Sequence, residues 1–463
     1  NCSYLTSIIL FASTPPRVYN NNQSNDIATI YVPETSVEKY EQQSNWTYNG
    51  SSTNRREILP ITDDILGGDL LPSNNVIKIT NDRVYTSGNY PKGSPNIQLS
   101  PTYTTSSSTA SLQIEENTPI QVDTLLLSYD LGYCSWESDH SAYSSFINNS
   151  TEAKLNKVLL HYKVSESQTW RFLTFPFDVN LSDIRINKDS HASFVFRRYD
   201  GNERANNGVK YSWEEGYNGG NWINLDARDI LYSKIGYIFQ SNDVIDSLLF
   251  ISVDQKVGQQ FLEYNNSDQE IPLENHQSVN EVDKSWNLTG NPYSSFFNLR
   301  YMEYPAPIIV WDNGNYIALS TRDDDYALRP LEAFFTQKPD EVSSIVFRKE
   351  GRQINGMIQQ TFTSLRSSSS RQVFNLRLNQ GEFTDRSRVV FNPDAKLSYE
   401  LNCDAFKMRS SNLQMPQLYS LDQSGVEYAI NERPVDKGVV LLGFYVGTEE
   451  TYTLSLGASS NVQ

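Results

Sequence analysis

Two stretches of this chain, 116 residues apart, carry the same arrangement of structure-setting residues. In TWRFLTFPF, Trp170 lies six residues before Pro176, and in SWNLTGNPY, Trp286 lies six residues before Pro292; an aromatic residue follows each proline. Downstream of each stretch comes an aromatic-Asp pair close to a glycine, in FRRYDG and IVWDNG, and then an aromatic segment ending on glutamine, in GYIFQ and AFFTQ. A repeated order of landmarks indicates a duplicated structural unit.

The duplication predicts that residues 165–245 and 282–345 superpose as related β-units. Trp170 and Trp286 are then expected in equivalent buried positions, where each serves as a structural anchor next to its Pro-aromatic turn (Pro176, Pro292). A duplicated active site would repeat His, Cys, Ser or paired carboxylates, and none of these recurs. The repeat therefore predicts architecture rather than chemistry.

The predicted fold is mainly β. Short segments rich in β-branched and aromatic residues recur from residue 76 onward, as in TLLLSY, SFVFRRY and GVVLLGFYV, and turn-forming residues bound most of them. Such regular short strands are typical of β-sandwiches and jelly rolls. Only residues 36–43 resemble a helix, with Thr35 or Ser36 as the cap and Val37 and Tyr40 on one side.

Length and charge limit the class of protein. A chain of 463 residues predicts two to four domains. The net charge of −17 and the pI near 4.8 disfavour nucleic acid and anionic membrane surfaces as partners, since both require basic patches. No apolar run approaches the ~20 residues that span a bilayer. None near the start resembles a signal peptide, so the leader of a secreted protein would be absent from this chain.

The first 46 residues contain two short strands, a Thr-Pro-Pro turn and a short helix. The segments NCSYLTSI, TPPRV and ATIYVPETSVEKYEQQSNW resemble the final repeat of the BspA-type leucine-rich repeat surface proteins of Bacteroidetes. The resemblance implies a C-terminal cap of a solenoid. We expect its small core, formed by Leu5, Ile8, Ile30, Val32 and Val37, to be incompletely covered on the Asn1 side.

The duplicated region has a family resemblance of its own. SWNLTGNPYSSFF, VWDNGNY and LRPLEAFFTQ are similar to a module near the C-termini of many secreted Bacteroidetes proteins, and ERPVDKGVVLLGFYVGTEETYTLSL resembles the start of their terminal β-sandwich. That sandwich continues with further strands in the family, so the last domain is either truncated or completed by strands elsewhere. The expected organisation is a leucine-rich-repeat cap (1–46), a linker (47–75), one or more β-sandwich modules with the first Trp-Pro unit (76–280), a β module with the second (281–380) and a C-terminal β-sandwich (381–463).

Several polar residues invite a chemical interpretation that the sequence does not favour. Asp323, Asp324 and Asp325 lack the Gly and the distant Glu of a calcium loop, and consecutive residues of an extended chain alternate sides, so an exposed turn is expected. Cys134 and His161 lack any nucleophile signature, and three cysteines (Cys2, Cys134, Cys403) exclude a disulfide scaffold. His140, His191 and His276 show no metal-binding spacing. We expect no catalytic group, metal or cofactor.

The segment 199–222 combines five large aromatic residues with Asn, Gly and Glu, which is typical of a long loop. It either covers a sandwich edge or contacts a ligand. If the protein binds sugar directly, we expect Trp213, Tyr217 and Trp222 to stack on it and Glu214 to accept hydrogen bonds.

The family resemblance implies a non-enzymatic adhesion or binding protein, extracellular or on the outer-membrane surface, whose partner is a host or matrix protein or a glycan. A polysaccharide-processing or carbohydrate-binding accessory protein is the first alternative. A structural stalk that presents a leucine-rich-repeat solenoid is the second.

Overall fold

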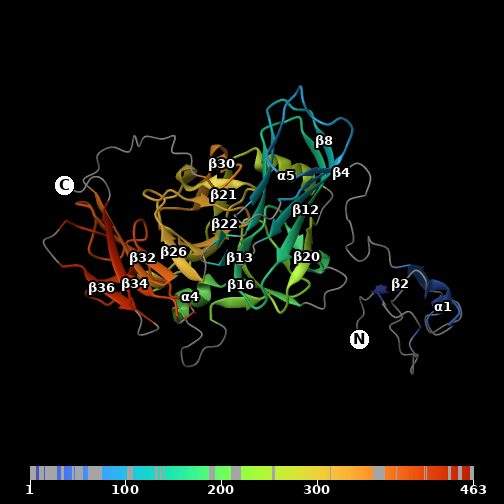
Figure 1. Ribbon diagram of the computed structural model, residues 1–463. Coiled ribbons are helices and arrows are strands. Elements are labelled where there is room, and N and C mark those ends of the chain that lie inside the picture. The colour runs from blue at the N-terminus through green and yellow to red at the C-terminus, as the bar shows by residue number, and fades with distance from the viewer. Residues whose placement is uncertain are drawn as a thin grey trace. The chain divides into compact units, whose positions relative to one another are not determined.

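The computed structural model of the chain is mainly β, as predicted. The structure describes residues 7–9, 15, 29–32, 36–43, 46, 56–60, 76–101, 108–130, 134–135, 138–139, 141–186, 193–209, 220–252, 256–312, 314–357, 371–381, 383–410, 412, 414–435, 439–446 and 451–458. The chain forms two compact units (Figure 1). Unit 1 comprises Asn1–Asn74 with Arg185–Ser190, and unit 2 comprises Asn75–Ile184 with His191–Gln463.

Unit 1 contains a parallel sheet of three strands, β1 (Ser7–Ile9), β2 (Thr29–Val32) and β3 (Glu57–Pro60), with helix α1 (Val37–Glu41) in the β2–β3 crossover. Ile8, Ile30 and Ile58 occupy successive paired positions across it. Its core consists of buried residues from β2, α1, β3 and the α1–β3 connection: Ile30, Val32, Tyr40, Ile58 and Trp46, with Val37 packed against them. Leu5 lies outside the described residues. β3 falls within the segment expected to be a linker. Residues of this unit also include β15 (Arg185–Ile186).

Unit 2 begins with a large mixed sheet, in which β20, β12, β8, β11, β7 and β5 follow one another and β6 joins β4 to β8. Its long central strands are buried on both faces and rich in Leu, Val, Ile and Tyr, the composition expected when neighbouring strands run parallel. Helix α5 (Val257–Asn265) packs on this sheet, with Phe261 stacked on Phe146 at 5.5 Å. The strand bounds are β4 (Val76–Ile79), β5 (Arg83–Tyr85), β6 (Asn96–Leu99), β7 (Ser108–Ile114), β8 (Gln121–Asp130), β11 (Ala142–Asn148), β12 (Lys154–Val164) and β20 (Ile245–Ile251), with the short pair β9 (Cys134–Ser135) and β10 (Ser138–Asp139).

The two copies of the repeated phrase form two antiparallel sheets of identical strand order. In each sheet the first strand pairs with the fourth, the fourth with the second and the second with the third. The first sheet has β13 (Arg171–Thr174), β16 (Phe194–Tyr199), β17 (Trp222–Asn224) and β19 (Gly236–Ser241). The second has β22 (Trp286–Gly290), β25 (Ile308–Asp312), β26 (Asn315–Leu319) and β28 (Ala333–Gln337). The Pro-aromatic turn of each repeat leads into another short pair, β14 (Val179–Asn180) with β18 (Ile230–Leu231), and β23 (Phe296–Asn298) with β27 (Ala327–Leu328).

Strand register makes the two sheets equivalent residue by residue. Tyr199 pairs with Trp222 in the first sheet, and Trp311 pairs with Tyr316 in the second. The register thereby matches Tyr199 to Trp311, and the aspartates that follow, Asp200 and Asp312, also correspond. The topology predicted for residues 165–245 and 282–345 is therefore present.

Burial of the two anchor tryptophans differs, so the expectation that both are buried is wrong for one. Trp286 is 1% exposed, because Arg204 of helix α4 (Gly201–Asn207) covers its ring at 4.7 Å and Phe335 packs edge-on at 6.1 Å. Trp170 is half-buried. It lies just before β13 and packs over Arg197 at 4.6 Å. Pro176 and Pro292 are both buried.

The two repeated sheets pack against each other, and β13 and β22 lie side by side in Figure 1. One face of each sheet forms this contact, as strand alternation allows. The other face of the first sheet packs on the large mixed sheet, with Phe196 6.2 Å from Phe250, and the other face of the second sheet forms the core of its own repeat. We call the layer in which the two repeated sheets meet the seam. It contains Phe172, Tyr199 and Trp222 from the first repeat and Trp286, Leu288, Ile309 and Phe335 from the second.

The remaining strands complete unit 2. β21 (Gln269–Pro272), β29 (Ser344–Phe347) and β24 (Met302–Glu303) form a three-stranded sheet, and β30 (Arg352–Gln353) pairs with β23. A C-terminal sheet has the order β36-β34-β35-β32-β31-β37, with β33 paired to β35. Its strands are β31 (Gln372–Gln380), β32 (Phe383–Phe391), β33 (Ala405–Phe406), β34 (Gln417–Leu421), β35 (Glu427–Arg433), β36 (Leu441–Tyr445) and β37 (Thr453–Ala458). Single 3-10 turns lie at Leu181–Asp183, Glu281–Asp283, Leu299–Tyr301 and Lys349–Gly351.

Candidate ligand-binding pocket

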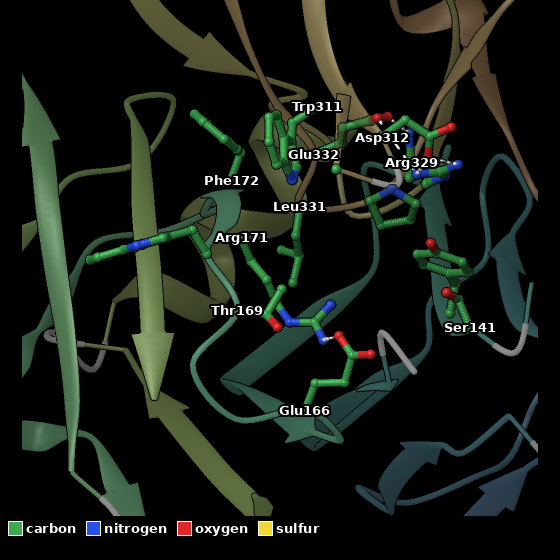
Figure 2. Close-up of a pocket in the computed structure, with 14 residues that line it drawn as sticks. Ser141, Glu166, Thr169, Arg171, Phe172, Trp311, Asp312, Arg329, Leu331 and Glu332 are labelled. Carbon is green, nitrogen blue, oxygen red and sulfur yellow. Dashed lines mark hydrogen bonds and ion pairs between the residues drawn. The ribbon is translucent and has the colours of Figure 1, made fainter. Parts of the chain in front are cut away.

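A pocket of about 220 Å³ opens at the edge of the seam, where the two repeats meet. The first repeat contributes Phe172 of β13 and Trp170 just before that strand. The second contributes Trp311 and Asp312 at the end of β25, and Figure 2 shows Phe172, Trp311 and Asp312 around the pocket. The wall between them comes from the connection of β27 to β28, which carries Arg329 to Glu332. The pocket therefore exists only because the two repeats pack together.

Aromatic rings form one side of the pocket. The rings of Phe172 and Trp311 lie 5.7 Å apart, and Trp311 meets Tyr316 edge-on at 4.6 Å. Phe172, Trp311 and Trp170 are all half-buried. Because each ring is packed on one side and open on the other, the rings offer rigid apolar surface at little conformational cost.

Two ion pairs also line the pocket. The Arg329 guanidinium donates from Nη1 and Nη2 to Oδ1 of Asp312, at 3.1 and 3.0 Å. These two side chains are 29% and 26% exposed, so part of each remains open. At the lower edge, Arg171 donates to Glu166 at 3.3 Å. Each pair places a positive and a negative group together, so neither contributes a net charge to the pocket.

Glu332 is held more tightly than the other acids. Its Oε1 accepts from the Tyr326 hydroxyl at 2.8 Å and its Oε2 from the Arg329 amide at 2.7 Å. Burial raises the pKa of the Glu332 carboxyl above its usual value, while the positive charge of Arg329 opposes that rise. The carboxyl is therefore fixed in the wall of the pocket.

The backbone of this wall is strained and anchored. Leu331 has a φ of +64°, in the left-handed region that non-glycine residues rarely adopt. Its carbonyl oxygen accepts from the Thr174 amide at 3.0 Å, and Leu173 bridges to Glu332. The first repeat thus holds the pocket wall of the second repeat in place.

Of the residues that the sequence suggested as sugar contacts, only Trp222 is described by the structure, and it does not line this pocket. Trp213, Glu214 and Tyr217 lie outside the described residues. Trp222 opens β17 and packs in the seam, 5.2 Å from Tyr199 and 6.1 Å from Phe335. The expectation of one continuous loop at 199–222 is wrong at its start, because Asp200 accepts from the Glu203 amide at 3.0 Å and caps helix α4.

The other candidate residues have structural partners. The Asp323 carboxylate pairs with Arg371 at 2.9 Å, Asp324 with Arg388 at 2.7 Å, and Asp325 with Arg300. Three consecutive carboxylates thus turn toward three different arginines. Across the described parts of the chain, no group of three or more His, Cys, Asp and Glu side chains could hold a metal ion.

Among the histidine and cysteine candidates, His161, His276 and Cys403 are described by the structure. The ring Nε2 of His161 lies 3.2 Å from the Asp246 carbonyl oxygen, and burial lowers the pKa of His161. The ring Nδ1 of His276 lies 2.9 Å from Oδ1 of Asn202. The side chain of Cys134 and the residues Cys2, His140 and His191 lie outside the described set. Cys403 is a free thiol whose pKa burial raises strongly, which disfavours the reactive thiolate.

Sequence reasoning did not identify Trp311, Arg329 and Glu332 as site residues, and it used Asp312 only as a landmark of the repeat. A signal was nevertheless present in the duplication. Asp200 and Asp312 occupy corresponding positions, yet Asp200 caps a helix whereas Asp312 pairs with Arg329. A landmark present in both copies but bonded differently in each indicates that one copy has a separate role.

Comparison with known proteins gives no further guidance: no family model, no curated protein and no solved structure matches this chain. Among the residues that the structure describes, no helix has the length and apolar character needed to cross a membrane.

Proposed function

We propose that this chain is a non-enzymatic binding protein of an extracellular or outer-membrane surface, and that its ligand enters the pocket at the seam. The observation that carries the proposal is the pocket itself. It combines half-exposed aromatic rings with fixed hydrogen-bonding groups, the usual composition of a small-molecule site.

The parallel sheet of unit 1 supports the leucine-rich-repeat part of the proposal. Paired positions recur at Ile8, Ile30 and Ile58, which are separated by 22 (30 − 8) and 28 (58 − 30) residues. Leucine-rich repeats have periods of ~20–29 residues and place one parallel strand in each repeat. A cap of this kind, followed by tandem β-sandwich modules, is the organisation that the family resemblance implies.

The hydrogen bonds in the pocket favour binding over catalysis. A general acid or base must be free to exchange a proton with its substrate. Both oxygens of Glu332 are already engaged, and Asp312 faces a guanidinium. Polysaccharide processing remains the second candidate, because the raised pKa of Glu332 and its closeness to a second carboxylate in the same pocket are typical of glycoside hydrolysis.

Filling the pocket tests the proposal. Thr169 is exposed and lines the pocket, so Thr169→Trp inserts a large ring without disturbing a core; Ser167→Trp adds the same ring to an exposed residue two positions away that does not line the pocket. Both variants and the natural chain are applied to arrays of immobilised glycans and extracellular-matrix proteins.

We expect Thr169→Trp to abolish binding and Ser167→Trp to preserve it. Ligand capture that survives Thr169→Trp would show that the pocket is not the binding site. Any captured glycan is then incubated with the natural chain, and release of new reducing ends would replace the binding proposal with the enzymatic one.

A further inference from the structure

The charge balance of the pocket restricts its ligand. Asp312 is neutralised by Arg329 and Glu166 by Arg171, each through a direct contact. The third carboxyl group, Glu332, is buried beside Arg329 with both oxygens hydrogen-bonded, and burial raises its pKa, which favours its uncharged form. An ionic ligand would need an unpaired charge of opposite sign, or would have to break one of these pairs at a large desolvation cost. The pocket therefore suits an uncharged molecule.

Unused hydrogen-bonding atoms show what such a molecule must offer. Both bonds from Arg329 go to Oδ1 of Asp312, and no donor among the described residues reaches Oδ2. The Thr169 hydroxyl also lines the pocket, is exposed, and donates only a long bond of 3.4 Å to the Ser167 carbonyl oxygen. An open acceptor and an open donor in one pocket match a ligand with several hydroxyl groups, each of which can both donate and accept.

The aromatic rings add a requirement for apolar faces. Trp311 and Phe172 present rigid, partly exposed rings next to the ion pairs, with Trp170 also lining the pocket. A sugar ring has C–H groups on its faces and hydroxyls at its edge. Few other uncharged molecules combine the two in this way.

The volume sets the size of the ligand. Sites for drug-sized molecules enclose ~300–1,000 Å³. The pocket holds about 220 Å³ and therefore has room for one ring rather than for a long chain.

We infer that the pocket at the seam recognises a single uncharged sugar ring, as a free saccharide or as one residue of a longer glycan. This inference rests on the proposed function, because it identifies the ligand class of the same site. One ring supplies few contacts, so the dissociation constant is expected to be on the order of 1 mM.

Titration calorimetry with two sets of saccharides tests the inference. One set contains neutral hexoses, N-acetylhexosamines and their short oligomers, and the other contains uronic and sialic acid analogues. At concentrations up to ~20 mM, well above the expected dissociation constant, we expect binding of at least one neutral saccharide and weaker binding of its acidic analogue. Absence of binding in the neutral set, or preference for the acidic set, would overturn the inference.

Substitutions locate the contact. Trp311→Ala is expected to weaken binding about tenfold, and Asp312→Asn, which keeps the size of the side chain, about fivefold. Tyr264→Ala and Asp325→Asn are matched controls, since both side chains are partly exposed and lie outside the pocket, and neither should change affinity by more than about twofold. Thermal unfolding confirms that each variant is folded. If Trp311→Ala does not fold, Asp312→Asn still tests the site. Unchanged affinity in Asp312→Asn would overturn the inference.

The two proposals fail in different ways. If Thr169→Trp abolishes capture of a protein or of an acidic glycan while no neutral saccharide binds, the pocket is a binding site and only the ligand class is wrong. If Thr169→Trp leaves the capture of every ligand unchanged, the pocket is not the binding site.

Discussion

Arg204 is the residue that most directly connects the two repeats. Its side chain is completely buried, its Nε donates to Asp283 at 2.7 Å, and its guanidinium covers the ring of Trp286. Arg204 belongs to α4 of the first repeat, whereas its partners belong to the second. A buried charge in this position stabilises the fold only while it remains paired.

We expect Arg204→Met to destabilise the protein by about 3 kcal/mol, because the substitution leaves the Asp283 carboxylate without its counter-ion. Urea unfolding measures the loss. Arg228→Met is the matched control: Arg228 forms an ion pair of similar length with Asp226, but both side chains are exposed, so no measurable change is expected. Equal losses in the two variants would contradict the role assigned to Arg204.

Asp404 makes stability depend on pH. Burial raises its pKa from 3.8 to about 8, although the amides of Glu400 and Glu432 both donate to its carboxyl group. Between about pH 4 and pH 8 the folded protein retains a proton on Asp404 that the unfolded chain releases. The free energy of unfolding therefore falls as pH rises through this window.

Asp404→Asn removes that titration. We expect the variant to lose less stability than the natural chain between about pH 4 and pH 8, even though one backbone donor loses its acceptor. Urea unfolding across this range measures the slope. Asp394→Asn, at an exposed position, should keep the natural slope. An unchanged slope in Asp404→Asn would show that the carboxyl ionises normally in the folded state.

At the scale of strands, the duplication could be predicted from sequence because distinctive residue types recur in it in the same order. Trp170 and Trp286 mark the start of a first strand, and Gln240 and Gln337 lie near the end of the fourth strand that pairs with it. The contact between the two sheets could not be predicted in the same way. Phe172 and Tyr199 lie on one face of their strands, whereas Phe196 lies on the other face and packs on Phe250 of the large mixed sheet, so the pattern identifies two buried faces without saying what covers each.

Phe335 of β28 lies at the centre of the seam. Its ring contacts Phe172, Tyr199 and Trp222 of the first repeat and Trp286 of its own. We expect Phe335→Ala to cost about 3–5 kcal/mol and to loosen both sheets together. Hydrogen exchange should show lost protection in β13 as well as in β28.

Phe297→Ala provides the comparison, because Phe297 is equally buried but packs within the core of the second repeat alone. Phe297→Ala should lower the hydrogen-exchange protection of β13 less than that of β28. If Phe335→Ala spares β13 as well, the two sheets do not share a cooperative interface.

At the scale of the whole molecule, the mainly β class followed from composition and turn spacing, but the site did not. Trp170 and Trp311 are 141 residues apart, and only the packing of one repeat on the other brings them to the same pocket. The segment 199–222 attracted attention because it concentrates aromatic residues in the sequence. Trp222 shows the limit of that argument, because its ring contributes to the packing of the seam.

The central claim is that a ligand binds between the repeats, against Trp170 and Trp311. Fluorine NMR of protein labelled with 5-fluorotryptophan tests it most directly, since the chain has only seven tryptophans and Trp170→Phe and Trp311→Phe assign two of the signals. On titration with the tightest-binding neutral saccharide, we predict that the signals of Trp170 and Trp311 shift and that the signal of the buried Trp286 does not. Saturable binding that leaves the signals of Trp170 and Trp311 unmoved would contradict the account.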